Sequence, residues 1–276
     1  MNLFEDKVMS SFQREKRQWC GDYMIVDIFP RTKAQELAAK GTRKRTTEVS
    51  RPAQRNLNDK NSKKNFNLVA NGNFGEGDYV VRYSYSNKFL PKTLEQAKKD
   101  ISNYIDRLKY ELKKTGQDKD LKWMCVTEFN EPNKKGEKVR IHHHLIINKV
   151  VPYDLIFDKW TKGRGKNKKK IGLVHVDRIQ LTEDSFIENL VGYLFKNNRE
   201  NRHWTASRNL ERPKEKVTDF KYRRRKIEQL VYSTDEGKEY YEKMYPDHYV
   251  RHITYKENDF YGWQVSIKLR KRERDG

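Results

Sequence analysis

The amino-acid sequence predicts an α+β fold in which helices cover an antiparallel sheet. Residues 79–198 read in the order strand, helix, strand, strand, helix, strand, helix. Two of these strands are separated only by the turn-rich linker NEPNKKGEK, which is typical of a hairpin. One helix carries a single apolar stripe, and such a helix needs a flat surface to pack on, as a sheet provides.

The central helices and strands follow from local patterns. A helix is predicted over 58–71, with Phe66, Val69 and Ala70 on one face and Gly72 as its stop. A strand follows at 79–85, where YVVRYSY is rich in β-forming residues. Thr93 and Gln96 form a capping box for the next helix, which ends at Gly116. Its stripe repeats every three or four residues at Leu94, Ala97, Ile101, Ile105, Leu108 and Leu112.

The remaining elements complete the pattern. Strands are predicted at 121–129 and 139–148, a helix at 153–160 and a strand at 173–178. A last helix opens at Thr182, with acidic residues behind it, and runs to about Asn198.

The terminal regions differ in composition from this centre. We expect a basic N-terminal extension (1–50), a central domain (51–213) and a charged, aromatic C-terminal extension (214–276). In the first we predict one strand at 24–29 and then loop or a poorly ordered arm. The last contains the cluster KYRRRK at 221–226 and a strand-like end, YGWQVSIKLRK.

Composition limits the class of protein. Of 276 residues only 35% are apolar, and 60 Lys and Arg against 39 Asp and Glu give a net charge of +21. Such a surplus repels itself unless a polyanion screens it, which favours nucleic acid or an acidic membrane as partner. There is no long apolar run and no signal peptide, and two cysteines are too few for a disulfide framework. We therefore expect a cytoplasmic, nucleic-acid-binding protein.

Three consecutive histidines lie inside the strand at 139–148. Side chains alternate across a strand, so His142 and His144 share one face and His143 points to the other, with Ile141, Leu145 and Ile147. Imidazoles two residues apart can converge on one cation. The alternative is a polar strand that contains histidines by chance. Glu128 ends the neighbouring strand, where it is either a third metal ligand or an ordinary surface carboxylate.

Two residues of the last helix are candidates for chemistry. Tyr193 and Lys196 are three residues apart and therefore neighbours on its surface, so the ammonium can lie beside the phenol or beside a phosphate. A phenol with a pKa of about 10 needs such help to act as a nucleophile. The alternative is that Tyr193 packs and Lys196 complements the helix dipole.

Basic clusters are candidates for phosphate contact. Lys168, Lys169 and Lys170 form one, and Arg223 and Arg224 belong to another. The alternative is that both are solvated. Tyr83 and Tyr85 either stack on unpaired bases or fill the core. The sequence has no phosphate-binding loop of the G-x-x-x-x-G-K-[ST] type, so we expect it to carry no helicase motor of its own.

The order of these motifs resembles that of the HUH endonucleases, and in particular the rolling-circle replication initiators of bacterial plasmids and of filamentous and other single-stranded-DNA phages. The resemblance rests on NSKKNFNLVANGNFGEGDYVVRYSYS (61–86), Val126-Thr127-Glu128, His142 to Ile147, the Tyr193 and Lys196 pair, and Ser207 to Pro213. It covers residues 51–213 and assigns them to an endonuclease domain. The strand at 79–85 departs from the Leu-Thr-Leu-Thr pattern of the family.

This resemblance implies a five-stranded antiparallel sheet of the RNA-recognition-motif type and a specific chemistry. His142, His144 and Glu128 would hold Mg²⁺ or Mn²⁺, Tyr193 would form a 5′-phosphotyrosine with single-stranded DNA, and Lys196 would orient the phosphate. The implied partners are an origin hairpin, a separate host helicase and, because one tyrosine occupies the motif, a second copy of the protein at termination.

Two other classes of function stay open at this point. A plasmid-mobilising relaxase or a single-strand transposase would share the chemistry, although relaxases usually show three clustered metal histidines. A non-catalytic basic nucleic-acid-binding protein would carry the same histidines incidentally.

Overall fold

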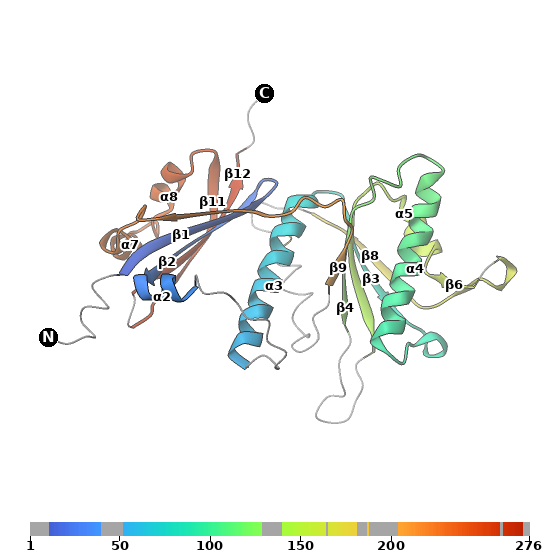
Figure 1. Ribbon diagram of the computed structural model, residues 1–276. Helices are drawn as coiled ribbons and strands as arrows, with labels where there is room; N and C mark the ends of the chain where they lie inside the picture. The colour runs from blue at the N-terminus through green and yellow to red at the C-terminus, as the bar shows by residue number, and fades with distance from the viewer. Residues whose placement is uncertain are drawn as a thin grey trace. The chain divides into compact units, whose positions relative to one another are not determined.

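The computed structural model describes residues 11–39, 52–128, 140–163, 165–180, 187, 204–259 and 262–272. The chain forms two compact units (Figure 1). The terminal unit comprises residues 1–58 and 212–276, and the central unit comprises residues 59–211. Each is built on a five-stranded antiparallel sheet with helices, which confirms the predicted α+β class.

The sheet of the central unit has the strand order β8-β3-β5-β4-β9. Its strands are β3 (Tyr79–Ser84), β4 (Trp123–Glu128), β5 (His142–Ile147), β8 (Val174–Arg178) and β9 (Trp204–Ala206). The predicted hairpin exists, since β4 pairs with β5 over their full lengths. β9 was not predicted, because three residues are too few for an alternating pattern to be recognised.

The helices of this region agree with their sequence signals. They are α3 (Pro52–Asn73), α4 (Leu94–Lys113) and α5 (Tyr153–Asp158). α3 starts earlier than predicted, at a proline, which suits the first helical position because the missing N–H has no helical partner there. The Thr93 hydroxyl accepts a hydrogen bond from the Gln96 backbone N at 3.2 Å, so the predicted cap is present.

A short hairpin leaves the sheet after α5. It consists of β6 (Thr161–Lys162) and β7 (Lys169–Lys170), with a 3₁₀ turn at Gly165–Asn167 between them. A second 3₁₀ turn, Asn87–Phe89, precedes α4. Among the described residues, no helix combines the length and apolar character needed to cross a membrane.

Each face of the central sheet is covered by different elements, α3 on one and α4 on the other (Figure 1). The α4 face buries the larger cluster, in which Val81, Tyr83, Leu145 and Ile147 meet the predicted stripe of α4. The α3 face buries Phe66, Val69 and Ala70 against Met124, Val126 and Ile146. Burial on both sides therefore fixes which face each residue of β5 takes.

The terminal unit joins the two ends of the chain in one sheet, with the order β10-β1-β2-β12-β11. The segments that we expected as separate extensions thus pair with each other, and the expected arm after residue 31 contains a helix. The strands are β1 (Ser11–Cys20), β2 (Tyr23–Thr32), β10 (Lys214–Asp219), β11 (His248–Lys256) and β12 (Gln264–Lys271); the helices are α2 (Lys33–Ala39), α7 (Arg224–Val231) and α8 (Lys238–Met244).

A buried carboxylate explains part of the basic cluster at 221–226. Glu15 of β1 is fully buried and accepts a hydrogen bond of 2.6 Å from the Tyr245 hydroxyl. The Lys221 ammonium lies 3.3 Å from the same carboxylate, and Arg17 lies 3.2 Å from it. Lys221 therefore stabilises the inside of this unit and is not a surface cation.

Gly172 lets residues 171–173 run directly beside the end of β3. Ser84 N donates to Leu173 O at 3.0 Å, and a Cβ placed on Gly172 would lie 1.8 Å from Ser84 O. We expect Gly172→Ala to lower the free energy of unfolding by about 1–3 kcal/mol, because the clash is with backbone that cannot rotate away. Urea denaturation measures the change. Gly75→Ala is the control, since its added Cβ would meet no atom within 4 Å; equal losses in both variants would contradict this explanation.

Candidate functional site

The two outer histidines of β5 lie on the α3 face of the central sheet. His142 is directly opposite Glu128 of β4, and His144 is opposite Val126. Paired residues of an antiparallel sheet point to the same face, so both imidazoles and the Glu128 carboxylate share one side. The hairpin between β4 and β5 therefore brings together the three residues that the sequence singles out for metal binding. We call them the His–Glu face.

Within this face, His144 and Glu128 are in contact. Nε2 of His144 and Oε2 of Glu128 are 3.4 Å apart, and both side chains are largely buried. His142 is half-buried beside them; its partial burial lowers its pKa, while the Glu128 charge opposes that shift. In the described part of the chain, no three His, Cys, Asp or Glu side chains converge closely enough to form a metal-binding group. The structure thus brings two of the three candidates into contact and places the third next to them.

The contact between His144 and Glu128 suits two ligands of one divalent cation. Two ligand atoms that each lie about 2.1 Å from a shared ion, at right angles, are about 3 Å apart. Imidazole nitrogen and carboxylate oxygen are also ligand types that Mn²⁺ accepts. The lowered pKa of His142 keeps its ring neutral, as a ligand must be. The pair therefore fits a metal, with His142 as the nearest candidate for a third position.

His143 occupies the opposite face and is a core residue. It is fully buried, and its two ring nitrogens contact the hydroxyls of Tyr85 at 2.7 Å and Thr127 at 2.9 Å. Burial, with the nearby charges of His144 and His142, lowers the pKa of His143 to about 3. The predicted alternation of the three histidines is thus confirmed.

Removing His143 should cost stability. We expect His143→Ala to lower the free energy of unfolding by about 2–4 kcal/mol, because it leaves a cavity and two buried hydroxyls without their partner. Urea denaturation gives the value. The matched control is His175→Ala on β8, whose imidazole is exposed and should change stability by less than about 0.5 kcal/mol. A wild-type value for the His143 variant would show that the two hydroxyl contacts contribute nothing.

Arg82 is a residue of this face that the sequence did not reveal. On β3 it is paired with His144 on one side and His175 on the other, and its side chain is exposed. Its guanidinium acts on His142 in the direction that lowers the pKa. Only the pairing of β3 with β5 identifies Arg82 as a neighbour of the histidines, and no local pattern in YVVRYSY predicts this.

Tyr193 and Lys196 lie outside the described residues, as does most of the helix predicted at 182–198. Ile187 of this segment is described: it is helical, buried, and packed in the cluster on the α3 face. The chain that leads to Tyr193 therefore packs on the same side of the sheet as His142, His144 and Glu128.

The predicted DNA-binding cations are at the surface. Lys168, Lys169 and Lys170 are exposed in and beside β7 of the central unit. Arg223 and Arg224 are exposed at the start of α7 in the terminal unit, where Arg224 forms an ion pair of 2.9 Å with Glu228. By contrast, Tyr83 and Tyr85 fill the core, and the Tyr83 hydroxyl donates to that of Tyr104. The base-stacking alternative for these two tyrosines is wrong.

Residues 73–199 match the family model of replication-associated proteins of the ORF2 type. The match covers less than half of the chain, but it includes Glu128, His142, His144, Tyr193 and Lys196. No curated protein and no solved structure matches the chain. The match supports a replication-associated role for the central unit, as a replication initiator.

Proposed function

We propose that this chain is a rolling-circle replication initiator that nicks and rejoins single-stranded DNA at an origin. The matched family supplies the role in replication, and the His–Glu face supplies the chemistry. The observation that carries the proposal is the contact between His144 and Glu128, with His142 beside them, on the side of the sheet where Ile187 packs. Ile187 lies six residues before Tyr193, so the helical segment that holds the proposed nucleophile starts on this side.

In the proposed reaction, the phenol oxygen of Tyr193 attacks the phosphorus of one phosphodiester. The new bond joins this oxygen to the 5′-phosphate, the bond from phosphorus to the 3′-oxygen breaks, and the phenol proton is balanced by protonation of the 3′-oxygen. Rejoining is the reverse reaction, in which a 3′-hydroxyl attacks the phosphotyrosine. No external energy source is needed, since one phosphoester replaces another.

The residues of the site have separate roles in this scheme. His142, His144 and Glu128 would hold Mg²⁺ or Mn²⁺, and such an ion supplies Lewis-acid polarisation of a non-bridging phosphate oxygen. Lys196, one turn after Tyr193, would orient the same phosphate. Arg82, exposed beside His144 in the register of the sheet, adds a positive charge next to the place where the phosphate would bind.

DNA binding would rest largely on phosphate contacts. Lys168, Lys169, Lys170, Arg223 and Arg224 are exposed cations that can neutralise phosphates and release counterions. Since the chain lacks a phosphate-binding loop, a separate host helicase would unwind the duplex. A single tyrosine in the motif helix would require a second copy of the protein at termination.

The experiment that tests this proposal uses hairpin-containing single-stranded DNA with a randomised loop, incubated with the wild-type protein and Mn²⁺. DNA labelled at the 3′ end should give a labelled protein band that survives SDS. The same DNA labelled at the 5′ end should give a shortened strand that a polymerase can extend. Binding without either product would favour the non-catalytic alternative, and a label retained from the 5′ end would reverse the proposed polarity.

A further inference from the structure

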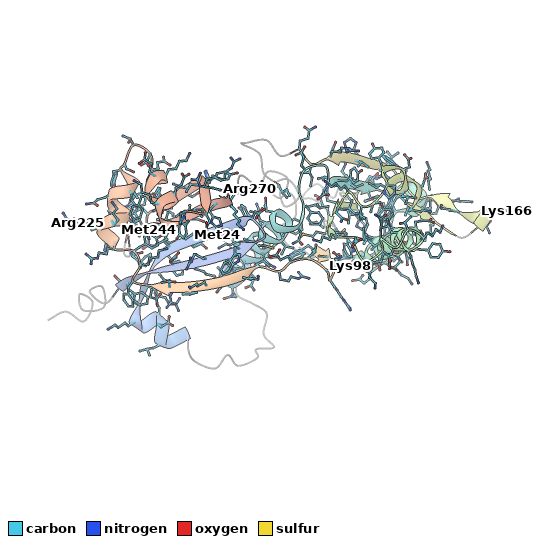
Figure 2. The ribbon with its side chains drawn as sticks, turned by 90° about the horizontal axis from the view of Figure 1, so that it is seen from above. Met24, Lys98, Lys166, Arg225, Met244 and Arg270 are labelled. Carbon is cyan, nitrogen blue, oxygen red and sulfur yellow. The ribbon has the colours of Figure 1, made fainter. Side chains whose placement is uncertain are left out.

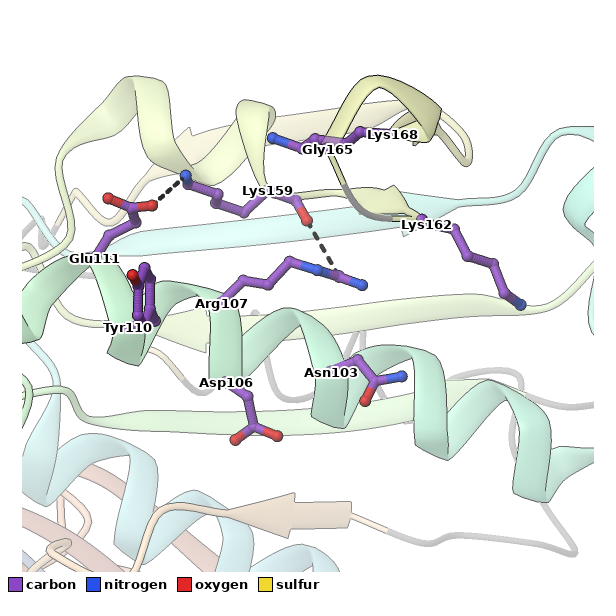
Figure 3. Close-up of a pocket in the computed structure, with 10 residues that line it drawn as sticks. Asn103, Asp106, Arg107, Tyr110, Glu111, Lys159, Lys162, Gly165 and Lys168 are labelled. Carbon is purple, nitrogen blue, oxygen red and sulfur yellow. Dashed lines mark hydrogen bonds and ion pairs between the residues drawn. The ribbon is translucent and has the colours of Figure 1, made fainter.

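A groove runs along α4, on the face of the central sheet opposite the His–Glu face. It has a volume of about 980 Å³ and lies between α4 and the β6–β7 hairpin (Figure 3). A second hollow of about 470 Å³ lies beside Lys88 to Lys92. Both are lined by Asn103 and Lys162, so they form one continuous depression. We call it the α4 groove.

The α4 groove carries more positive than negative side chains. Two of its three carboxylates are paired: Glu111 with Lys159 at 2.7 Å, and Asp100 with Lys162 at 3.4 Å (Figure 3 shows the first). The third carboxylate is that of Asp106. The cations that line it are Lys88, Lys92, Lys99, Arg107, Lys159, Lys162 and Lys168. A surface of this charge attracts a polyanion.

The hairpin at one side of the groove is more strongly basic. Residues 161–170 read TKGRGKNKKK, with six Lys or Arg and no acidic residue. Every described residue from Lys162 to Lys170 is exposed, and Lys166 lies at the outer end of the hairpin (Figure 2). A ten-residue, two-stranded hairpin is an element that the major groove of B-DNA can admit.

The base of this hairpin is held firmly by the core. Trp160 and Ile171, which flank it, are 1% and 2% exposed. The Trp160 indole donates a hydrogen bond to Ser84 O at 3.0 Å, and Arg107 donates to Lys159 O at 3.4 Å. The exposed cations thus project from a preformed support, which reduces the entropy lost when they bind a partner.

We propose that the α4 groove and the β6–β7 hairpin bind double-helical DNA, with the hairpin in the major groove and the α4 cations along one phosphate backbone. The inference rests on the proposed function only in that the duplex would flank the nicked strand. Because the two faces of the sheet are separate, the duplex and the reacting single strand would bind to opposite sides. Duplex RNA fits this surface poorly, since its major groove is deep and narrow.

The test compares two double variants of the full chain. Lys162→Gln with Lys166→Gln removes two charges from the hairpin, and Lys98→Gln with Lys113→Gln removes two from α4 outside the groove. Fluorescence anisotropy is measured with a 20-base-pair DNA duplex, the same sequence as a single strand, and the same duplex in RNA. We expect the hairpin variant to bind duplex DNA at least tenfold more weakly. Its log–log salt slope should fall by about 1.8, or 0.9 per lost phosphate contact.

The controls make the outcome decisive. The Lys98 and Lys113 variant should stay within about twofold of wild type on duplex DNA, and the hairpin variant should stay within about twofold on the single strand. Equal losses on duplex and single strand, equal losses in both variants, or tight binding of duplex RNA would overturn the inference. These are binding measurements, so a wild-type protein that forms no covalent product would refute the proposed function and leave this inference intact.

Discussion

Tyr193→Phe should abolish the covalent protein–DNA product while leaving DNA binding within about twofold of wild type. The substitution removes only the hydroxyl oxygen that would form the bond to phosphorus, and loss of a nucleophile typically lowers the rate by about 10³-fold or more. The measurement is the yield of SDS-resistant product from 3′-labelled single-stranded DNA, with anisotropy on the same DNA as the binding assay.

A matched control separates this effect from a general loss of tyrosine. Tyr232→Phe removes a hydroxyl from an exposed tyrosine of the terminal unit and should leave the yield unchanged. Peptide mapping of the wild-type product should place the DNA on Tyr193. Full yield from Tyr193→Phe would assign the nucleophile to another residue and contradict the proposed reaction.

His144→Ala should lower the rate of cleavage by about 10³-fold, because a divalent cation that polarises a phosphate oxygen is worth several kcal/mol. His142→Ala should have an effect of the same kind. Glu128→Gln keeps the shape of the side chain and removes its charge, so we expect cleavage to need a higher Mn²⁺ concentration. Single-turnover rates across an Mn²⁺ titration measure both effects.

The control for these variants is another histidine of the same sheet. His175→Ala on β8 removes an exposed imidazole that pairs with Asp177 at 3.3 Å, away from Glu128 in the strand order. It should cleave at the wild-type rate with an unchanged Mn²⁺ dependence. If His144→Ala also cleaves normally at every Mn²⁺ concentration, the His–Glu face does not hold the ion that the reaction uses.

The central unit was largely predictable because its signals are local. The cap at Thr93 and the stripe that follows define α4 within one segment, and alternation places His143 in the core and His142 and His144 opposite it. The hairpin linker predicted the pairing of β4 with β5, which brings Glu128 next to His142. By contrast, Arg82 becomes a neighbour of His144 only through a strand some sixty residues away in the sequence.

The terminal unit could not be predicted in the same way. β1 reads SFQREKRQWC, and two of its inward positions are Gln13 and Glu15, so its buried side does not look apolar. Glu15 is tolerated there because Lys221 and Tyr245, more than two hundred residues away, contact its carboxylate. Single-sequence patterns show neither such compensation nor the pairing of β1 with β10.

The strand order of the terminal unit also has a consequence for synthesis of the chain. β12, the last strand to leave the ribosome, lies between β2 and β11, so β2 waits for its inner neighbour until nearly the whole polypeptide has been made. The central unit has no such dependence, because all of its residues lie between the two halves of the terminal sheet. During translation, β1 and β2 therefore expose an edge that a chaperone or a neighbouring nascent chain can reach. A ribosome that stalls before β12 releases a product whose central unit is complete and whose terminal sheet cannot close.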